Sequence, residues 1–482
     1  MTFLGIDVGS SSIKAQTIDE DGSLLEFTSH DVSDLLRRPQ PIWAERDPET
    51  LWQAVCKTLR AMKHLDAVEA LSVDATSGSV LAVDDKLRPL SPILLYSDKR
   101  AQAETEYVRE RSPEARAYEP YLPLDASLAI PKILWLKRNM PNFSEVKMVM
   151  NETDYVQARL TGEVCTSPSI AGKTHVDIRS GLYVEKIFDE VGIELLLLPP
   201  IRPICFLLGR VTERASRDTG IGKDVVVANG VTDATGADVA TGTLGVGQVN
   251  VSIGSSLVVH AVTDKALPDY EKRIYYKSYV DGKILAGGAT DAGTLPLSCL
   301  AKLLGKSVQE LDDLAASVCP TCDGLLAQPQ WIGSRIPYHN PRIRGFFVGI
   351  TEQAMSPGHL QRSLLEGNGF VLQQVLDVIQ TVTRLELKEV KTSGGASRSD
   401  VQNQIIADIT GRPVLAVKTS EASLGSAMLA LHSHGNRPPL GEVARRVVRI
   451  RRTFTPTQEA HIAYLRASER FASITETLYG SG

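Results

Sequence analysis

Residues 3–15 read FLGIDVGSSSIKA, an apolar stretch that breaks at glycine and three serines and then resumes. This alternation predicts two antiparallel strands joined by a tight turn, with Asp7 near the end of the first strand. Such a turn can direct backbone N–H groups and hydroxyls at phosphoryl oxygens, and an aspartate beside it can hold Mg²⁺ through water. The alternative is an ordinary hairpin whose polar side chains only satisfy the turn. The predicted phosphate contacts are Gly9, Ser10, Ser11 and Ser12.

The same pattern returns in the second half of the chain. Residues 249–260 read VNVSIGSSLVVH, which again predicts a strand, a glycine–serine turn and a second strand. Two such hairpins facing one cleft can bind successive phosphates of a nucleotide, whereas a Walker-type loop uses a single turn at a helix N-terminus. The sequence contains no Gly-x-x-x-x-Gly-Lys-Ser/Thr motif. We therefore predict an internally duplicated chain, with further phosphate contacts at Gly254, Ser255 and Ser256.

Length and composition limit the classes of partner. A chain of 482 residues is longer than one that folds around a single hydrophobic core, so we expect two large lobes, residues 1–240 and 241–482. A formal net charge of −5 provides no field that attracts nucleic acid. The leucine-rich residues 193–208 are interrupted by prolines and cannot form a membrane span. We expect a small-molecule partner, no nucleic acid and no membrane, with a homodimer as a candidate oligomeric state.

The cysteines and the first residues predict a cytoplasmic location. Six cysteines are too few for a disulfide framework in a chain of this length. The start of the sequence has no basic segment followed by an apolar segment, as a secretory signal would. The Cys-x-x-Cys spacing at residues 319–322 has no second pair and no nearby histidine, so we interpret these thiols as incidental.

Short apolar strands alternate with longer helical patterns along the whole chain, which predicts an α/β fold. In the first half, helices are expected over residues 48–62 and 127–139. In the second half, they are expected over residues 307–317, 357–382 and 399–410.

Two further blocks carry candidate chemistry. Residues 229–237 read NGVTDATGA after an apolar strand, which places Asp233 in a glycine-rich strand-to-helix turn. A carboxylate there can face a cleft, or it can simply cap the alanine-rich helix that follows. Residues 392–399 read TSGGASRS, and the paired glycines would let the backbone lie flat under a purine and its sugar. The alternative for that block is a plain glycine turn.

Taken in order, these blocks resemble the FGGY carbohydrate kinases, of the same fold superfamily as actin and hexokinase, over essentially the whole chain. Residues 345–350 (GFFVGI), followed after eight residues by residues 359–366 (HLQRSLLE), match that family's C-terminal signature at every restricted position. Residues 131–139 (PKILWLKRN) match its N-terminal signature, except that Ala129 stands where the pattern has Pro, Ser or Thr. Residues 43–48 (WAERDP) are similar to an early block of the family. The resemblance implies two ribonuclease H-like ATPase lobes with a cleft between them.

The resemblance also implies roles for individual residues. Asp233 would be the general base that accepts a proton as a sugar hydroxyl attacks the γ-phosphoryl group of ATP, which is what phosphoryl transfer requires. Asp7 and Asp233 would hold Mg²⁺ through water. The C-terminal lobe would bind ATP, and the residues implied there are Gly288, Gly394, Gly395 and Ala396.

The identity of the sugar depends on the N-terminal lobe. Xylulokinases of this family usually show Gly-Gln-Met-His-Gly where residues 74–78 here read DATSG, so the hydroxyls of Thr76 and Ser77 look more like ribulokinase variants. Tyr96 aligns with a pocket tryptophan, although an ordinary core tyrosine is the alternative, and Asp98 lies in the same block. We predict a kinase for D-ribulose or D-xylulose. The alternatives are a kinase for a tetrulose, erythritol or glycerol, and a non-catalytic nucleotide switch of the actin and Hsp70 type.

Overall fold

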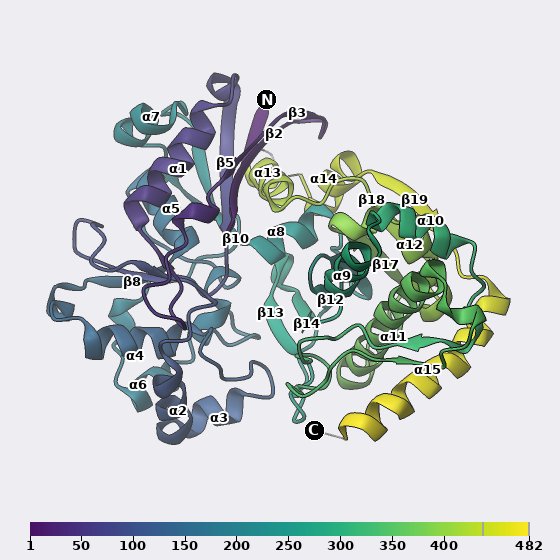
Figure 1. The fold of residues 1–482 in the computed structure, drawn as a ribbon. Coiled ribbons are helices and arrows are strands. Elements are labelled where there is room, and N and C mark those ends of the chain that lie inside the picture. The colour runs from purple at the N-terminus through teal and green to yellow at the C-terminus, as the bar shows by residue number, and fades with distance from the viewer. Residues whose placement is uncertain (436–437, 481–482) are drawn as a thin grey trace. The chain divides into compact units, whose positions relative to one another are not determined.

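The computed structural model describes residues 1–435 and 438–480, which form two compact α/β units (Figure 1). Unit 1 comprises Met1–Gly242, Lys277–Ile284 and Ser420–Val448, and unit 2 comprises Thr243–Tyr276, Leu285–Thr419 and Arg449–Gly482. Two late segments therefore pack with the N-terminal part of the chain. The assignment of sugar binding to residues 1–240 and of ATP binding to residues 241–482 stays a prediction, as does the homodimer.

Unit 1 is built on a six-stranded sheet. The hairpin that opens the sequence forms as predicted, with β1 antiparallel to β2 and Val8 opposite Ile13. β1 is buried along its whole length and pairs in parallel with β5, which pairs in parallel with β10. In sheet order, the strands are β3 (Leu24–Asp31), β2 (Ser12–Asp19), β1 (Thr2–Val8), β5 (Val68–Ala75), β10 (Val226–Thr232) and β9 (Leu207–Arg210).

Helix α13 (Ala422–Ser433) packs against β1 and β5 although it comes late in the sequence (Figure 1). It also packs against α8 (Asp233–Ala240), where a Cβ on Gly425 would lie 1.9 Å from the Gly236 carbonyl oxygen. Glycine is therefore required at that contact. The other helices of unit 1 are α1 (Pro48–Arg60), α2 (Gln102–Arg111), α3 (Pro113–Tyr118), α4 (Ala129–Asn139), α5 (Glu152–Thr161), α6 (Glu185–Val191), α7 (Glu213–Thr219) and α14 (Leu440–Val447).

A smaller sheet and several single turns complete unit 1. The sheet has the order β4 (Glu45–Arg46), β7 (Ile93–Leu94), β6 (Val80–Val83) and β8 (Met148–Asn151). The 3₁₀ turns of this unit are η1 (Ser33–Leu35), η2 (Leu65–Ala67), η3 (Phe143–Glu145), η4 (Ile170–Thr174), η5 (Leu195–Leu197) and η6 (Val280–Gly282).

Unit 2 repeats the strand plan of unit 1. β11 and β12 form an antiparallel hairpin, β17 is parallel to β11, β18 is parallel to β17, and β19 closes the edge antiparallel to β18. The sheet order is β13 (Tyr275–Ser278), β14 (Ile284–Ala289), β12 (Leu257–Thr263), β11 (Gln248–Ile253), β17 (Glu389–Ser393), β18 (Val414–Val417) and β19 (Ile450–Phe454), with a separate pair β15 (Leu326–Ala327) and β16 (Phe347–Val348).

The helices of both units agree with the periodicity of the sequence. The five predicted helical stretches correspond to α1, α4, α10, α11 and α12, each with ends within two residues of the prediction. No helix in the described ranges is long and apolar enough to cross a membrane. The helices of unit 2 are α9 (Leu295–Leu304), α10 (Val308–Ala316), α11 (Pro357–Thr383), α12 (Asp400–Thr410) and α15 (Gln458–Tyr479), and its turns are η7 (Cys322–Gly324), η8 (Gln353–Met355) and η9 (Gly395–Arg398).

Candidate active site

Three carboxylates meet at the C-terminal ends of three neighbouring parallel strands in unit 1. Asp7 on β1 stands in register with Asp74 on β5. Val231 on β10 stands opposite Asp74, and Asp233 follows it by two residues as the first residue of α8. The side chains of Asp7 and Asp74 are buried, and Asp233 is half-buried. The structure thus brings the two predicted acids together and adds Asp74, to which the sequence assigned no role.

Burial and the neighbouring charges raise the pKa values of two of these acids. Burial raises the pKa of Asp7 to about 7, the charge of Asp233 adds to that effect, and Lys14 opposes it. Burial and the charge of Asp7 raise the pKa of Asp74 well above its usual value, although the Ser426 hydroxyl donates to Asp74 Oδ2 at 2.5 Å. Crowded, buried carboxylates are costly without a cation, and titratable groups perturbed in this way are typical of functional sites.

Lys14 links the first hairpin to the start of α13. Its Nζ lies 2.5 Å from Glu421 Oε2 and 4.0 Å from Asp7 Oδ2. Burial lowers the pKa of Lys14, but the bond to Glu421 and the charges of Glu421, Asp7 and Asp74 together outweigh that effect and leave the pKa above its usual value. Glu421 comes about 400 residues after Lys14, so no local signal in the sequence predicted this pair.

A buried ion pair connects the first phosphate turn to the loop after β5. Arg46 Nε donates to Glu152 Oε1 at 2.5 Å, and Arg46 Nη1 donates to the Gly9 carbonyl at 2.9 Å. The Thr76 hydroxyl donates to Glu152 Oε2 at 2.9 Å. Arg46 and Glu152 are 1% and 0% exposed, so removing one partner would leave an uncompensated charge inside the protein. The pair fixes both loops relative to the acids.

The turn at Gly9 has the shape and the free groups expected of a phosphate site. The Gly9 N–H donates to the Ser12 carbonyl at 3.0 Å, and a Cβ on Gly9 would lie 2.8 Å from that oxygen. Ser10 and Ser11 are exposed, and their hydroxyls have no partner within the described residues. Ser12 begins β2. Phosphate binding by this turn stays a proposal.

The loop predicted to bind the sugar has two different hydroxyls. Thr76 is 5% exposed and its hydroxyl already bonds to Glu152 and, at 2.8 Å, to Ser79 Oγ. Ser77 is half-buried and makes no such bond in the described structure. Gly78 has φ +75°, and its carbonyl accepts from Lys132 Nζ at 2.7 Å. Burial lowers the pKa of Lys132 to about 7.

Tyr96 and Asp98, from one predicted sugar block, have different surroundings. Asp98 is fully buried, where its carboxylate accepts from Arg100 Nε at 2.9 Å and from the Ala44 N–H at 2.7 Å. Tyr96 is 43% exposed, so it is not a core residue. Tyr96 is therefore better placed than Asp98 to meet a ligand.

Unit 2 contains the second predicted phosphate turn. The Gly254 N–H donates to the Ser256 carbonyl at 3.0 Å, and Ser255 is exposed. Arg335 Nη2 donates to Ser256 Oγ at 2.9 Å, while Arg335 Nε lies 3.0 Å from Asp291 Oδ1. The sequence did not single out Arg335. A guanidinium at this turn adds a positive charge where phosphate is predicted.

The glycines predicted to contact adenosine differ in how much space a side chain would have at each position. A Cβ on Gly288 would lie 2.5 Å from the Tyr275 ring, and one on Gly394, at φ +80°, would lie 2.9 Å from the Ile253 carbonyl oxygen. Both glycines are therefore structural requirements. A Cβ on Gly395 would meet nothing within 4 Å. Ala396 lies in η9, but its side chain is outside the described part of the structure.

Comparison with known families identifies the chemistry of this fold. Residues 2–240 match the N-terminal domain of the FGGY family of carbohydrate kinases, and residues 250–434 match its C-terminal domain. The chain belongs to the FGGY family of carbohydrate kinases. It is accordingly a sugar kinase, a phosphotransferase that acts on a small-molecule sugar.

The relatives of this FGGY kinase are kinases named for different substrates. It is 28% identical to a xylulose kinase of Escherichia coli K12 over 488 residues, which cover 99% of each chain. It is 30% identical to a xylulose kinase of Lactococcus lactis over 90% of this chain and 88% of the other. A gluconokinase of Bacillus subtilis is 26% identical, with 90% and 88% covered.

Solved structures confirm the predicted fold of the FGGY kinase. The structure of a xyloylose kinase from Brucella ovis has a TM-score of 0.91 at 24% identity, with 99% of each chain covered. That of a xylulose kinase from Rhodospirillum rubrum has a TM-score of 0.89 at 25% identity, also with 99% of each chain covered. The two α/β units therefore have the ribonuclease H-like, actin-like ATPase fold that the sequence predicted.

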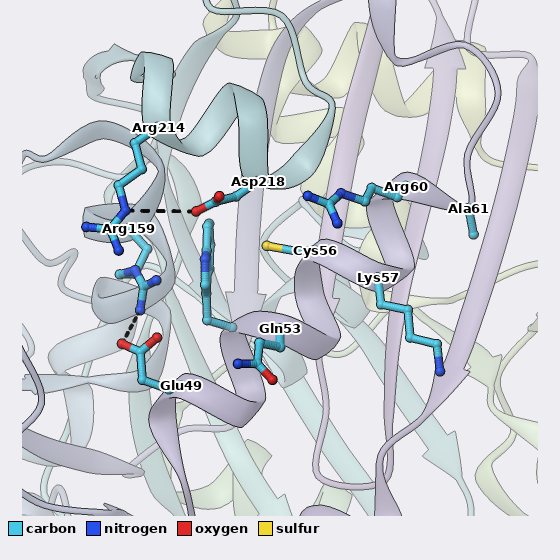
Figure 2. Close-up of a pocket in the computed structure, with 10 residues that line it drawn as sticks. Glu49, Gln53, Cys56, Lys57, Arg60, Ala61, Arg159, Arg214 and Asp218 are labelled. Atoms are coloured by element: carbon cyan, nitrogen blue, oxygen red, sulfur yellow. Dashed lines mark hydrogen bonds and ion pairs between the residues drawn. The ribbon is translucent and has the colours of Figure 1, made fainter.

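A cavity of about 600 Å³ in unit 1 lies apart from the predicted site residues. Figure 2 shows its lining from α1, α5 and α7, where Arg159 points at Glu49 and Arg214 at Asp218. The first of these ion pairs is 2.6 Å long and the second 4.0 Å. None of the predicted site residues lines this cavity.

Proposed function

We propose that this kinase transfers the γ-phosphoryl group of ATP to the terminal hydroxyl of a ketopentose, D-ribulose or D-xylulose. The observation that carries the proposal is the convergence of Asp7, Asp74 and Asp233 on adjacent strand ends, beside the hydroxyl-bearing loop that follows Asp74. The xylulose kinases among the relatives support a ketopentose, and the DATSG loop supports D-ribulose as the first candidate.

Asp233 is the proposed general base. It stands at the start of α8, half-buried, within the electrostatic reach of Asp7 and Glu152. A carboxylate in that position can accept the proton of a sugar hydroxyl as its oxygen attacks phosphorus. The fixed ion pair of Arg46 and Glu152 keeps the neighbouring loops in place while this occurs.

Carboxylate oxygens are the ligands that Mg²⁺ prefers, although the described residues contain no group of three or more His, Cys, Asp or Glu side chains placed to ligate a metal ion directly. Asp7 and Asp233 would hold it through water, and the ion would neutralise charge that develops on the transferred phosphoryl group. Asp74 stands beside Asp7 on the adjacent strand. The turns at Gly9–Ser12 and Gly254–Ser256 would hold the ATP phosphates, and Gly395 would lie against adenosine.

A substrate panel tests the proposal. ADP release is measured with ATP, Mg²⁺ and a set of ketopentoses, tetruloses, aldoses, aldonates and polyols that includes glycerol. We expect the highest kcat/KM for D-ribulose or D-xylulose. A higher value for gluconate, glycerol or a tetrulose would overturn the proposed substrate class but not the family assignment.

Gly395→Val should raise the KM for ATP by about tenfold or more and leave the ratio of activities toward two ketopentoses unchanged. The valine side chain has room in the free protein, because a Cβ there meets nothing within 4 Å, but it would occupy space proposed for adenosine. Steady-state kinetics with ATP and then sugar as the varied substrate measures this. A changed sugar ratio with an unchanged KM for ATP would contradict the assignment of this turn.

Ser77→Ala should reduce discrimination between D-ribulose and D-xylulose. A hydroxyl hydrogen bond in a site is worth about 1 to 3 kcal/mol when the wrong epimer leaves it unpaired, so the ratio of kcat/KM values should change by about 5- to 150-fold. Thr76→Ser is the matched control, because it retains the hydroxyl that bonds to Glu152. An equal loss for both sugars would show that Ser77 supports the loop without selecting the epimer.

A further inference from the structure

The cavity shown in Figure 2 is lined by arginines from three helices of unit 1. Arg60 is the last residue of α1, Arg159 lies on α5 and Arg214 lies on α7. Figure 2 shows Cys56 between these three side chains. The volume of the cavity, about 600 Å³, is within the range of about 300 to 1,000 Å³ that is usual for small-molecule sites. We call it the arginine cavity.

Arg159 is held in one orientation by its neighbours. Its Nη1 donates to Glu49 Oε1 and to the Tyr155 hydroxyl, both at 2.6 Å. Its guanidinium carbon lies 4.7 Å from the centroid of the Trp52 ring. The side chain is 13% exposed, and its Nε and Nη2 make no hydrogen bond within the described residues. Arg159 therefore lines the cavity with a guanidinium group that is already ordered and still has donors available.

Arg60 and Arg214 also have donors available. Arg60 Nη2 donates to the Arg217 carbonyl at 3.1 Å, and Arg60 forms no ion pair in the part of the chain that the structure describes. Arg214 is 79% exposed, and its Nε lies 4.0 Å from Asp218 Oδ2. An exposed ion pair of that length contributes little to stability, so the Arg214 guanidinium can pair with another anion at small cost.

The lining of the arginine cavity has more positive than negative charge. It contains four cationic side chains and two carboxylates, and each carboxylate is paired with one arginine. The Cys56 thiol adds no negative charge, because burial raises its pKa to about 11. The surplus of two positive charges matches the charge of about −2 on a phosphate monoester at neutral pH. The charged lining residues are Lys57, Arg60, Arg159, Arg214, Glu49 and Asp218.

The chemistry of the lining favours a phosphate ester over other anions. Guanidinium groups bind phosphate oxygens through pairs of parallel N–H donors, and three such groups around one space exceed what a singly charged carboxylate can use. Trp52 and Cys56 are 3% and 7% exposed, and their ring and thiol add an apolar surface to the same cavity. That surface can contact the carbon part of an ester, which inorganic phosphate lacks.

We propose that the arginine cavity binds a phosphate monoester with a short carbon chain, at a site separate from the catalytic carboxylates. None of Asp7, Asp74 and Asp233 lines the cavity, so binding there does not require the catalytic cluster. The product of a sugar kinase is itself an ester of this class. The proposal does not depend on which sugar the kinase phosphorylates.

Isothermal titration calorimetry of the wild type with ribose 5-phosphate, inorganic phosphate and ribose tests the proposal. Each titration is run on the protein alone and again with saturating ADP, Mg²⁺ and the sugar that the kinase prefers, which fill the active site. We expect the Kd for ribose 5-phosphate to agree within about twofold between the two conditions. With the active site filled, inorganic phosphate should bind at least about fivefold more weakly, and ribose should not bind.

Variants of the lining locate the ester. Arg159→Met should raise the Kd for ribose 5-phosphate by about 10- to 100-fold, the range of charge-assisted hydrogen bonds. Arg214→Gln, at an exposed position, should raise it by about two- to fivefold and leave the melting temperature unchanged. Arg210→Gln is the matched control, because Arg210 is an exposed arginine of unit 1 that lies 3.6 Å from Asp224 and does not line the cavity. Its Kd should stay within about 1.5-fold of wild type.

Three results would overturn the proposal. Loss of ribose 5-phosphate binding when the active site is filled would show that the ester binds only at the catalytic site. Equally tight binding of inorganic phosphate would contradict the assignment to an ester. If Arg159→Met has a lower melting temperature, Arg214→Gln decides, and a Kd equal to that of Arg210→Gln would show that the ester binds outside the arginine cavity.

Discussion

Asp233→Asn should lower turnover by about 10² to 10⁴, the usual contribution of a positioned general base, and leave ATP affinity nearly unchanged. Asparagine has almost the same shape, and its side-chain oxygen can still accept from the Ala234 N–H, which now lies 2.8 Å from Asp233 Oδ1. Helix α8 should therefore begin as before. Turnover and nucleotide affinity are measured in the same preparation, with melting temperature as the check on folding.

The competing interpretation of Asp233, as a helix cap, has its own control. The residue in the N-cap position of α8 is Thr232, and Asp233 is the first residue of the helix. The Thr232 side chain makes no bond to a helix N–H, but its hydroxyl lies 3.1 Å from Thr235 Oγ1, so Thr232→Ala should reduce stability, whereas Asp233→Asn should reduce turnover. Near-normal turnover of Asp233→Asn would contradict the role of Asp233 as general base. Asp233 would then only stabilise the start of α8.

Local sequence signals were sufficient for the individual hairpins and helices, whereas the two ribonuclease H-like lobes were implied by the resemblance to the FGGY family. The glycine–serine turns at Gly9 and Gly254 interrupt apolar alternation, and that interruption predicts a hairpin in each unit without any knowledge of tertiary contacts. The helix starts are also local: Asp47 accepts from the Thr50 N–H before a proline at the first position of α1. Elements defined by neighbours in sequence are therefore the predictable part.

The site was only partly predictable because its geometry depends on register. Asp7 and Asp74 meet because β1 and β5 pair residue for residue, and nothing near either aspartate specifies that pairing. Glu421 reaches Lys14 from a helix that belongs to unit 1 despite its late position. Arg335 reaches the second phosphate turn in the same way. Such residues become visible only when distant segments are placed together.

Motif position also gives no information on how a polar side chain is satisfied. Thr76 and Asp98 occur in the blocks predicted to bind sugar. In the structure, however, the Thr76 hydroxyl donates to Glu152 and the Asp98 carboxylate accepts from Arg100. Ser77 and Tyr96 come from the same blocks and are more accessible. The structure therefore ranks residues that the sequence could only group.

Asp7→Asn should make the metal-free protein more stable at pH 8 while it weakens Mg²⁺ binding. The pKa of Asp7 is about 7 in the folded protein against an ordinary value of 3.8, because burial and the charge of Asp233 disfavour its ionised form. The stability that protonated Asp7 contributes is complete below about pH 4 and is lost as the pH rises through 7. Since one pKa unit corresponds to about 1.36 kcal/mol, the loss amounts to at most about 4 kcal/mol.

The variant has no proton to lose at this position, so its free energy of unfolding should exceed that of wild type by about 2 to 4 kcal/mol at pH 8 and approach it at pH 4. Urea unfolding of both proteins, in chelator, at intervals across this range measures the difference, in which groups that do not interact with Asp7 cancel and Asp74 adds to the change because the charge of Asp7 raises its pKa. Added Mg²⁺ should then raise the stability of wild type at pH 8 much more than that of Asp7→Asn, because a ligand that binds only the folded state stabilises it. A difference between the two proteins that does not vary with pH would show that Asp7 is ionised throughout, and would contradict the crowding of the three carboxylates on which the site is built.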